Sequence, residues 1–455
     1  MIELNINEII KAVNGEAFNI QIDLITPKGV SIDTREDQLG KIFIPFKGAN
    51  VDGHDFLSLA YEKGAILAFS EKKLQTDKPY ILIESCFCAI KAFAKYYRSL
   101  FNIPIIGITG SAGKTTTKDI VASVLAQKFK TLKTMGNFNN EIGVPLTIFN
   151  LDKTYQVAVL EMGMNNFFEM HNLSDIVRPS FCIITNIGWA HVENLGSREG
   201  ILKAKSEIFD YKDETTKIIL NGDDDLLIKL KGELLANYYY LDNKDENYTA
   251  YNIVYNGIEN TKATFKIDNN IFDVNILLPG KHMVYNALVA AIVGSMLDLD
   301  IDQITTGIES FKPSKNRMDI INVNNYVIIN DVYNSSPDAI KSIVDTLSHA
   351  KGKKICILGD MLELGDFCKV LHEEIGQYVV MSNIDQLICI GTRAKNIYNA
   401  AVTHNKTLSD IQYFETKEQF INEWKNTLSA GDTILVKASR SMGFEDIVDR
   451  ISIIP

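Results

Sequence analysis

Apolar runs of strand length alternate with helical segments along the first two fifths of the chain. The runs KIFIPF (41–46), GAILAFS (64–70) and PYILIES (79–85) predict short strands. The segment CAIKAFAKYYRSLF (88–101) predicts a helix that ends before Pro104. Three further runs, PIIGIT (104–109), YQVAVLEMG (155–163) and FCIITNIG (181–188), are apolar at almost every position. Such runs favour parallel strands that are buried on both faces.

The later part of the chain repeats this alternation after a break. Residues 236–276 are rich in alternating β-formers and predict an antiparallel extension of the central sheet, and LPGKHMVYNALVAAIVGSMLDL (278–299) predicts a helix. Pro313 breaks the pattern, and new strands are expected at YVIINDVY, KKICILGD, QLICIGT and DTILVKAS. We therefore predict an α/β protein with three domains: an N-terminal α/β domain (1–98), a central P-loop-type parallel-sheet ATPase domain (99–312) and a Rossmann-like C-terminal domain (313–455).

Length and charge limit the classes of protein that fit. The 455 residues suit about three domains of roughly 150 residues. A net charge of -11 without a basic block argues against binding to long nucleic acid. The N-terminus MIELNINEII lacks a leader pattern, and no run approaches the roughly 20 apolar residues of a membrane span. We expect a cytoplasmic protein without membrane insertion, whose six cysteines are reduced.

A glycine-rich turn lies between the strand PIIGIT and the helical segment that follows. It comprises Gly110, Ser111, Ala112, Gly113, Lys114, Thr115 and Thr116. Backbone N–H groups at the start of a helix favour phosphate oxygens, a lysine reaches the β- and γ-phosphates, and a hydroxyl of Thr115 or Thr116 reaches Mg²⁺. The strict pattern requires glycine at position 108, where Ile108 stands. The turn therefore predicts a variant phosphate loop and a nucleotide triphosphatase of unspecified type.

Two candidate residues follow apolar runs in the same region. Glu161 follows YQVAVL, and His191 follows FCIITNIGWA. Functional groups gather at the carboxyl ends of parallel strands, and carboxylate and imidazole both suit a divalent ion that already holds ATP oxygens. Each residue also has a plain alternative, a surface acid for Glu161 and a capping or core histidine for His191. Lys205 in GILKAKSEIF is by its surroundings an ordinary solvated lysine.

At this point the motifs as a group resemble the Mur ligase family. The runs TGSAGKTTT, GNFNNEIGVP, LEMG, TNIGWAHVENLGS and KAKSEIF are similar to its central ATPase domain in order and spacing. SIDTRE with IPFKGANVDGHDF resembles its uridine-binding domain, and GKHMVYNALVA, DVYNSSPDA, LGDMLELG and LVKASRSMGFED follow in the expected order. LGDMLELG and DVYNSSPDA favour the members that add D-alanyl-D-alanine to a UDP-N-acetylmuramoyl-tripeptide. The resemblance spans nearly the whole chain.

The resemblance implies an acid–amino-acid ligase that uses ATP and Mg²⁺, forms an acyl phosphate and acts as a monomer. It implies four sets of site residues. Lys114, Glu161, His191 and a carbamylated Lys205 are the expected catalytic residues, and Thr115, Glu161, His191 and Lys205 the expected metal-side residues. ATP contacts are expected from the phosphate loop and from His282, Asn286, Arg317 and Asp331. Substrate contacts are expected from Thr34, Arg35, Lys47, Gly48 and His54 (UDP), Asn139 and Asn140 (muramoyl peptide), and Lys437, Ser439 and Arg440.

Three positions depart from the family pattern, and two alternatives stay open. Met283 replaces a common Asn, Ser336 replaces another, and Phe168 stands where a Gly is usual. One alternative is a different amino-acid-adding Mur ligase or a folylpolyglutamate synthetase. The other is a P-loop switch or partitioning ATPase, which would explain the loop and Glu161 but neither flanking domain. Dependence of ATP turnover on a nucleotide-sugar peptide separates these classes.

Overall fold

The computed structural model describes residues 1–21, 23–314, 316–323, 326–405, 407–423 and 429–453. The chain divides into two compact units. Unit 1 comprises Met1–Thr109, Phe129–Ile183 and Ser206–Lys217, and unit 2 comprises Gly110–Lys128, Ile184–Lys205 and Ile218–Pro455. We describe each unit by itself, and the three domain ranges expected from the sequence stay a prediction.

Unit 1 begins with a small five-stranded sheet. Its order is β2 (Glu16–Phe18), β7 (Tyr80–Leu82), β6 (Leu67–Ser70), β5 (Lys41–Phe43) and β4 (Gly29–Ser31), and only β2 runs antiparallel to its neighbour. A separate pair joins β1 (Leu4–Asn5) and β3 (Leu24–Ile25). The helical segments are α1 (Ile6–Val13), η1 (Gly53–Phe56), α2 (Leu57–Glu62) and α3 (Cys86–Ser99). The expected strands and the long helix are confirmed, and the Ser85 side chain caps α3.

The second part of unit 1 holds four strands of the larger central sheet. Their order is β11 (Phe181–Ile184), β8 (Ile105–Thr109), β10 (Val157–Glu161) and β9 (Thr131–Lys133). Strand β10 runs parallel to both β8 and β9. Every residue of β8, β10 and β11 is buried, as their unbroken apolar runs predict. The associated helical segments are α5 (Gly143–Ile148), α6 (Glu169–Val177) and η2 (Glu207–Phe209).

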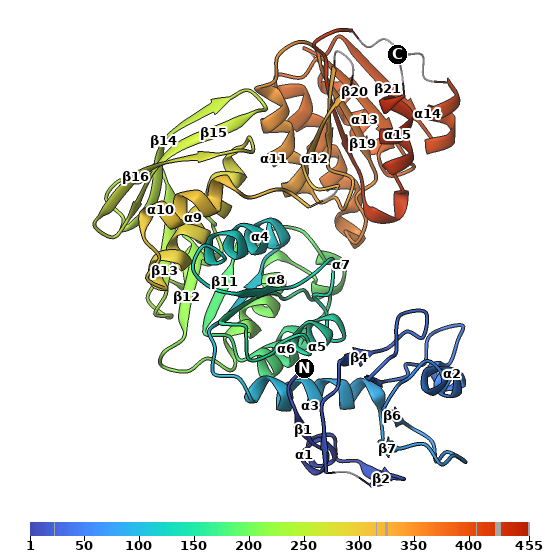
Figure 1. The fold of residues 1–455 in the computed structure, drawn as a ribbon. Coiled ribbons are helices and arrows are strands. Elements are labelled where there is room, and N and C mark those ends of the chain that lie inside the picture. The colour runs from blue at the N-terminus through green and yellow to red at the C-terminus, as the bar shows by residue number, and fades with distance from the viewer. Residues whose placement is uncertain (22, 315, 324–325, 406, 424–428, 454–455) are drawn as a thin grey trace. The chain divides into compact units, whose positions relative to one another are not determined.

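Unit 2 contains the helix after the phosphate loop and the other strands of the central sheet. The helical segments are α4 (Lys114–Leu125), α7 (Val192–Leu195), α8 (Arg198–Ser206), η3 (Leu227–Leu230), α9 (Lys281–Met296) and α10 (Ile301–Glu309). The strands are β12 (Lys217–Asn221), β13 (Asn237–Leu241), β14 (Tyr248–Asn256), β15 (Asn260–Ile267) and β16 (Asn270–Ile276). Figure 1 shows the long strands β14, β15 and β16 side by side, near α9 and α10.

The expected antiparallel extension is partly wrong. Strands β14, β15 and β16 are antiparallel, as predicted. Strand β13, however, runs parallel to β12 and to β14. The residues of β13 after the first are all buried, so this strand belongs with the buried parallel strands. In a strand that is buried on both faces, the alternation of apolar and polar residues no longer distinguishes antiparallel from parallel pairing.

The C-terminal part of unit 2 is a six-stranded sheet. Its order is β17 (Asp319–Val323), β18 (Tyr326–Asn330), β22 (Thr433–Lys437), β19 (Lys354–Gly359), β20 (Gln386–Ile390) and β21 (Asp410–Phe414), and only β17 is antiparallel to its neighbour. The helical segments are α11 (Pro337–Ser348), η4 (Gly365–Phe367), α12 (Cys368–Met381), α13 (Lys395–His404), α14 (Lys417–Glu423), η5 (Arg440–Met442) and α15 (Glu445–Ser452). The predicted α/β class is confirmed.

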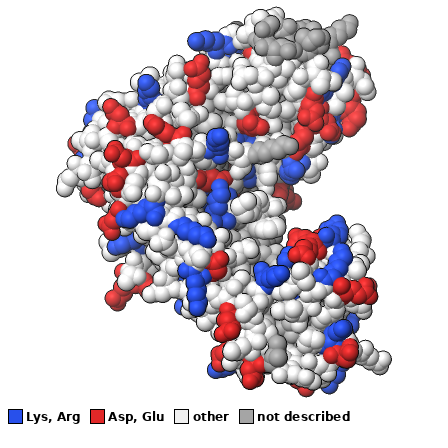
Figure 2. Space-filling view, in the orientation of Figure 1, with Lys and Arg blue, Asp and Glu red and all other residues white. Residues whose placement is uncertain are grey.

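The surface carries charges of both signs. On the face shown in Figure 2, Lys and Arg are interspersed with Asp and Glu. In the part of the chain that the structure describes, we find no helix that is both long and apolar enough to cross a membrane. All six cysteines are free thiols, and burial raises the pKa of Cys182 to about 12. A buried thiol with a raised pKa is chemically inert, as expected for core cysteines.

Candidate active site

The phosphate loop joins strand β8 to helix α4. Gly110 has a φ of +150° and Gly113 a φ of +82°, conformations that glycine adopts at little cost. A Cβ atom at Gly110 would lie 1.9 Å from Thr185 Oγ1, so no other residue fits at that position. Gly113 is the N-cap residue of α4, where the helix dipole and the first N–H groups favour an anion.

The shape of this loop is set by the residues that follow strand β11. The Ser111 N–H donates to the Asn186 carbonyl at 3.0 Å, and the Ala112 N–H donates to Asn186 Oδ1 at 2.9 Å. In return, Asn186 Nδ2 and Thr185 Oγ1 both donate to the Ala112 carbonyl, at 3.0 and 2.6 Å. Four hydrogen bonds therefore hold the loop in one conformation before any ligand binds.

The lysine and the threonines of the loop lie in the first turn of α4. Lys114 Nζ donates to the Gly110 carbonyl at 2.7 Å, which folds its ammonium back over the loop. Thr115 is buried and Thr116 half-buried. Thr117 Oγ1 donates to Asn286 Oδ1 at 3.0 Å, so the expected ATP residue Asn286, on α9, is tied directly to the loop helix.

Glu161 is the last residue of strand β10 and is buried, with 2% of its surface exposed. Asn139 Nδ2 donates to Glu161 Oε1 at 2.8 Å, and the Glu161 N–H donates to Thr134 Oγ1 at 3.0 Å. The Asn139 carbonyl also accepts from the Gly163 N–H at 2.7 Å. All these groups belong to unit 1. The carboxylate is thus held by its own unit, with one oxygen engaged by Asn139.

His191 immediately precedes α7 and has a φ of +67°, which is unusual for a residue other than glycine. Its Nδ1 lies 2.7 Å from Glu363 Oε2. Burial lowers the pKa of His191, the Glu363 carboxylate opposes this, and the charges of Lys114 and Lys205 lower it further. A carboxylate can only accept, so Nδ1 carries the proton and the Nε2 lone pair remains for another ligand.

Lys205 lies inside helix α8 with 1% of its surface exposed, which the solvated-lysine interpretation of the sequence does not fit. Burial lowers the pKa of this lysine well below its usual value, and the positive charge of Lys114 lowers it further. Desolvation favours the neutral amine, the form that acts as a nucleophile.

Several residues expected at the nucleotide or at the second substrate form one chain of contacts. Lys437 Nζ lies 2.5 Å from Asp331 Oδ2, and Asp331 Oδ1 accepts from the Met318 N–H at 3.1 Å. Met318 Sδ lies 3.3 Å from His282 Nε2. Burial lowers the pKa of His282 to about 4, so this side chain is neutral near pH 7. His282 Nδ1 is buried and has no hydrogen-bond partner among the described residues.

Arg317 and Arg440 both lie near one aromatic ring, that of Tyr333. The Arg317 guanidinium stacks 3.7 Å from the centre of the Tyr333 ring, and that of Arg440 lies 5.6 Å from it. Arg440 also pairs with Glu445. Nearby in sequence, Ser439 Oγ accepts from the Leu362 N–H at 2.9 Å. These cations are anchored by internal contacts, as a rigid anion-binding surface requires.

The residues expected to hold UDP lie in the first part of unit 1. Lys47, Gly48 and Arg35 are exposed, and Arg35 donates two hydrogen bonds to Asp33. That guanidinium lowers the pKa of Asp33 to about 2. Thr34 is buried, and its carbonyl accepts from Lys63 at 2.7 Å.

The buried ring of His54 uses both nitrogens inside the protein. Nδ1 lies 2.7 Å from Asp52 Oδ1, and Nε2 accepts from the Glu71 N–H at 3.0 Å. A direct contact with uridine would require one of these bonds to break. Asn140 is similarly engaged, since its Oδ1 accepts from the Gly143 N–H at 2.8 Å at the start of α5.

Unit 2 brings the phosphate loop together with His191 and Lys205, and unit 1 brings Asn139 onto Glu161. Three contributors were not singled out from the sequence: Asn186, Asp338 and Glu363. All three lie within the runs TNIGWAHVENLGS, DVYNSSPDA and LGDMLELG that carried the family resemblance. The sequence did offer one sign for Asn186, which is a polar residue just after a buried strand, where functional groups gather.

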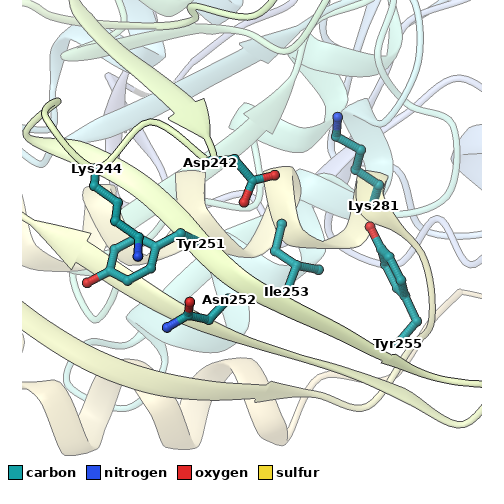
Figure 3. Close-up of a pocket in the computed structure, with 7 residues that line it drawn as sticks. All are labelled: Asp242, Lys244, Tyr251, Asn252, Ile253, Tyr255 and Lys281. Carbon is teal, nitrogen blue, oxygen red and sulfur yellow. The ribbon is translucent and has the colours of Figure 1, made fainter.

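A separate pocket of about 520 Å³ lies in unit 2 between β14 and the start of α9. Its lining residues are Asp242, Lys244, Tyr251, Asn252, Ile253, Tyr255 and Lys281. In the view of Figure 3, the Asp242 carboxylate lies between Lys244 and Lys281. None of these residues was expected at the site, although Lys281 directly precedes His282.

Comparison with known proteins identifies the family. Residues 108–294 match the Mur ligase middle domain, and residues 316–440 match the Mur ligase glutamate ligase domain. A UDP-N-acetylmuramoyl-tripeptide--D-alanyl-D-alanine ligase from Bacillus subtilis is 35% identical over 98% of each chain.

Solved structures agree with this comparison. MurF from Acinetobacter baumannii superposes with a TM-score of 0.90 at 26% identity, covering 99% of each chain. MurF ligase from Thermotoga maritima, solved in complex with ADP, gives a TM-score of 0.83 at 28% identity, covering 93% of this chain and 97% of that one. By sequence and by fold, the chain belongs to the Mur ligase family.

Proposed function

We infer that the chain is an ATP-dependent ligase that joins D-alanyl-D-alanine to a UDP-N-acetylmuramoyl-tripeptide, releasing ADP and phosphate. The observation that carries the reaction type is the phosphate loop, which Asn186 fixes beside the half-buried His191 and the buried Lys205. The choice of substrates rests on the likeness to the Bacillus subtilis ligase over 98% of both chains.

Peptide-bond formation from a free carboxylate requires its activation. Phosphoryl transfer to that carboxylate depends on positioning and on neutralising charge, and Lys114 at the start of α4 supplies a cation at the phosphate loop. The amine of the dipeptide then attacks the acyl phosphate, and cationic groups stabilise the resulting oxyanion. The fixed loop keeps these groups aligned without reorganisation during the reaction.

Each unit carries side chains that suit Mg²⁺. In unit 2, His191 is held with Nε2 unprotonated and Thr115 offers a hydroxyl, and in unit 1 Glu161 presents a buried carboxylate. Among the described residues, no three His, Cys, Asp or Glu side chains cluster tightly enough to hold a metal alone. Mg²⁺ usually keeps waters and takes phosphate oxygens with only one or two carboxylates, so a sparse set suffices. When bound, the ion neutralises charge on the transferred phosphoryl group.

The neutral amine of Lys205 fits conversion to a carbamate by CO₂, with release of a proton. The product carries a negative charge in place of a potential positive one, which adds an anionic oxygen donor on the metal side. Apart from His54, whose two ring nitrogens are engaged within the protein, the UDP-side and dipeptide-side residues keep the roles expected from the resemblance. We also place the reaction in the cytoplasm and expect a monomer.

Phosphate release from ATP in the presence of Mg²⁺ tests the reaction directly. The assay combines the UDP-muramoyl-tripeptide with D-alanyl-D-alanine, and mass spectrometry identifies the product. We expect release that requires both substrates and yields the pentapeptide. D-glutamate or L-lysine in place of the dipeptide serves as the matched control. Release that is indifferent to the dipeptide would refute the inference and favour a sister ligase or a switch ATPase.

A further inference from the structure

The loop that carries His191 is held from the C-terminal part of unit 2 by two carboxylates. The first belongs to Asp338, in the opening turn of α11, whose Oδ2 accepts from the Trp189 N–H at 2.9 Å. The approach is close, because a Cβ atom at Gly188 would lie 2.0 Å from that same oxygen. This contact fixes the backbone at Trp189, three residues before helix α7 begins at Val192.

The second carboxylate belongs to Glu363 and reaches the imidazole itself. Glu363 Oε2 lies 2.7 Å from His191 Nδ1, and the Glu363 carbonyl accepts from the Glu193 N–H at 3.3 Å. Glu363 and His191 have φ values of +62° and +67°, so both partners adopt the left-handed conformation. Non-glycine residues persist in this conformation only where surrounding contacts enforce it, and such residues cluster at functional sites.

Aromatic packing extends the same contact. The rings of Trp189 and Phe367 lie 5.2 Å apart at 48°, so the segment after Glu363 also touches the His191 loop. The contact thus comprises a backbone hydrogen bond to Asp338, a side-chain and a backbone contact to Glu363, and an aromatic pair. Only the Glu363 carboxylate touches a group with metal-binding chemistry.

We propose that Glu363 is a positioning residue that presents His191 Nε2 to the metal side of the site, and only while the segment after strand β19 lies against the His191 loop. This proposal rests on the function inferred above. The chemical reason is that a carboxylate acceptor keeps the proton on Nδ1, which fixes both the tautomer and the ring orientation. The C-terminal part of unit 2 thereby controls whether the imidazole is ready to bind an ion.

The test separates positioning from mere docking. Glu363→Ala removes the acceptor, Glu363→Gln keeps an oxygen acceptor but removes the charge, and Asp338→Ala removes the other point of attachment. Glu373→Ala is the matched control, because Glu373 lies on α12 and pairs only loosely with Lys369 at 3.8 Å. The probe is β,γ-methylene ATP, and its affinity is measured by calorimetry with and without Mg²⁺.

We expect Glu363→Ala to raise the Mg²⁺ concentration for half-maximal tightening of nucleotide binding about 10- to 100-fold, as loss of a partner of a metal-binding histidine does. Affinity without Mg²⁺ should stay at the wild-type value, which also shows that the variant folds. Glu363→Gln should fall between the two, and the Asp338→Ala shift should be smaller than that of Glu363→Ala. Hydrogen exchange over residues 187–196 should rise in both alanine variants.

Two outcomes would overturn the proposal. One is a Mg²⁺ dependence of Glu363→Ala that matches Glu373→Ala, and the other is an equal shift in Asp338→Ala and Glu363→Ala. The readout needs neither the tripeptide nor the dipeptide. Wild-type protein that fails to ligate D-alanyl-D-alanine but shows these shifts would therefore refute the inferred function while supporting the role of Glu363.

Discussion

Glu161 in unit 1 and His191 in unit 2 are both expected at the metal, yet they are held in different ways. Glu161 ends a buried strand and is held by Asn139 and Thr134, which lie in its own unit. His191 lies in a loop, in a left-handed conformation, and depends on Glu363 from a distant part of the chain. One group is therefore held by segments close to it within unit 1, and the other by a much more distant segment of unit 2.

The largest expected effect comes from removing the charge of the group in unit 1. Glu161→Gln should lower kcat about 10²- to 10³-fold, the usual range for loss of one preorganised electrostatic group. The amide keeps an oxygen for Asn139, so the fold should stay intact. Glu169→Gln, which alters a half-buried carboxylate that accepts from the Asn165 N–H, is the control. An unchanged rate of phosphate release in Glu161→Gln would mean that Glu161 does not bind the metal.

A second substitution tests whether the phosphate loop of unit 2 is equally preorganised. Gly110→Ala should destabilise the protein by at least about 1–3 kcal/mol and abolish tight nucleotide binding, because the new Cβ collides with Thr185. Gly232→Ala is the matched control, since Gly232 has a φ of +99° but nothing within 4 Å of its Cβ direction. Urea denaturation and calorimetry would measure both effects. Equal losses in the two variants would mean that backbone strain, and not the collision, matters.

Acid should weaken unit 2 before it affects the Arg35–Asp33 pair of unit 1. The pKa of His282 is lowered to about 4, so the unfolded chain binds this proton first as the pH falls below 6.5. Stability is therefore lost between about pH 6.5 and 4, by about 1–2 kcal/mol at pH 5. Asp33, with a pKa of about 2, contributes stability that is lost only at lower pH.

Hydrogen exchange at pH 7 and pH 5, corrected for intrinsic rates, would measure this difference. His282→Gln should reduce the pH dependence of unit 2 and leave that of unit 1 unchanged. The same pH dependence in His282→Gln and wild type would assign the loss to other groups.

The smallest expected effect concerns two neighbouring amides. Asn139→Ala should weaken the Mg²⁺ dependence of nucleotide binding about 10-fold, because Glu161 loses the donor that orients it. Asn140→Ala removes the acceptor for the Ile142 and Gly143 N–H groups at the start of α5 and should cost about 1 kcal/mol of stability without changing the Mg²⁺ dependence. Calorimetry and thermal unfolding of the pair would distinguish the two roles. A reversed pattern would mean that Asn140, and not Asn139, serves the metal side.

The sequence predicted those features that depend on local pattern. The phosphate loop, the buried strands and the strand-end position of Glu161 all follow from apolar runs and glycine spacing. The sequence did not predict contacts that need the three-dimensional fold. Asp331 and Lys437 were expected at different ligands, whereas the structure pairs them at 2.5 Å. The sequence likewise did not predict the burial of Lys205, because the charged residues Lys203 and Glu207 stand close to it on both sides and indicate an exposed helix.

The Glu363 contact illustrates the same limit. LGDMLELG was recognised as a family motif, but nothing local in it indicates that its one glutamate, Glu363, faces an imidazole. Pairings between distant segments are decided by how two sheets pack, and one sequence gives no record of that. The prediction that β13 is antiparallel was wrong for a related reason. Burial on both faces removes the alternation of apolar and polar residues from which an antiparallel strand is recognised.

The close approach of protein atoms to Gly110 and Gly188 has a consequence for inhibitor resistance. At either position a single added carbon would meet an oxygen of Thr185 or Asp338 at 2.0 Å or less. Any other residue at these two positions would have to displace Thr185 or Asp338, so we expect substitutions there to be costly. An inhibitor that binds the backbone of Gly110 and Gly188, with few contacts to variable side chains, would therefore leave few genetic routes of escape.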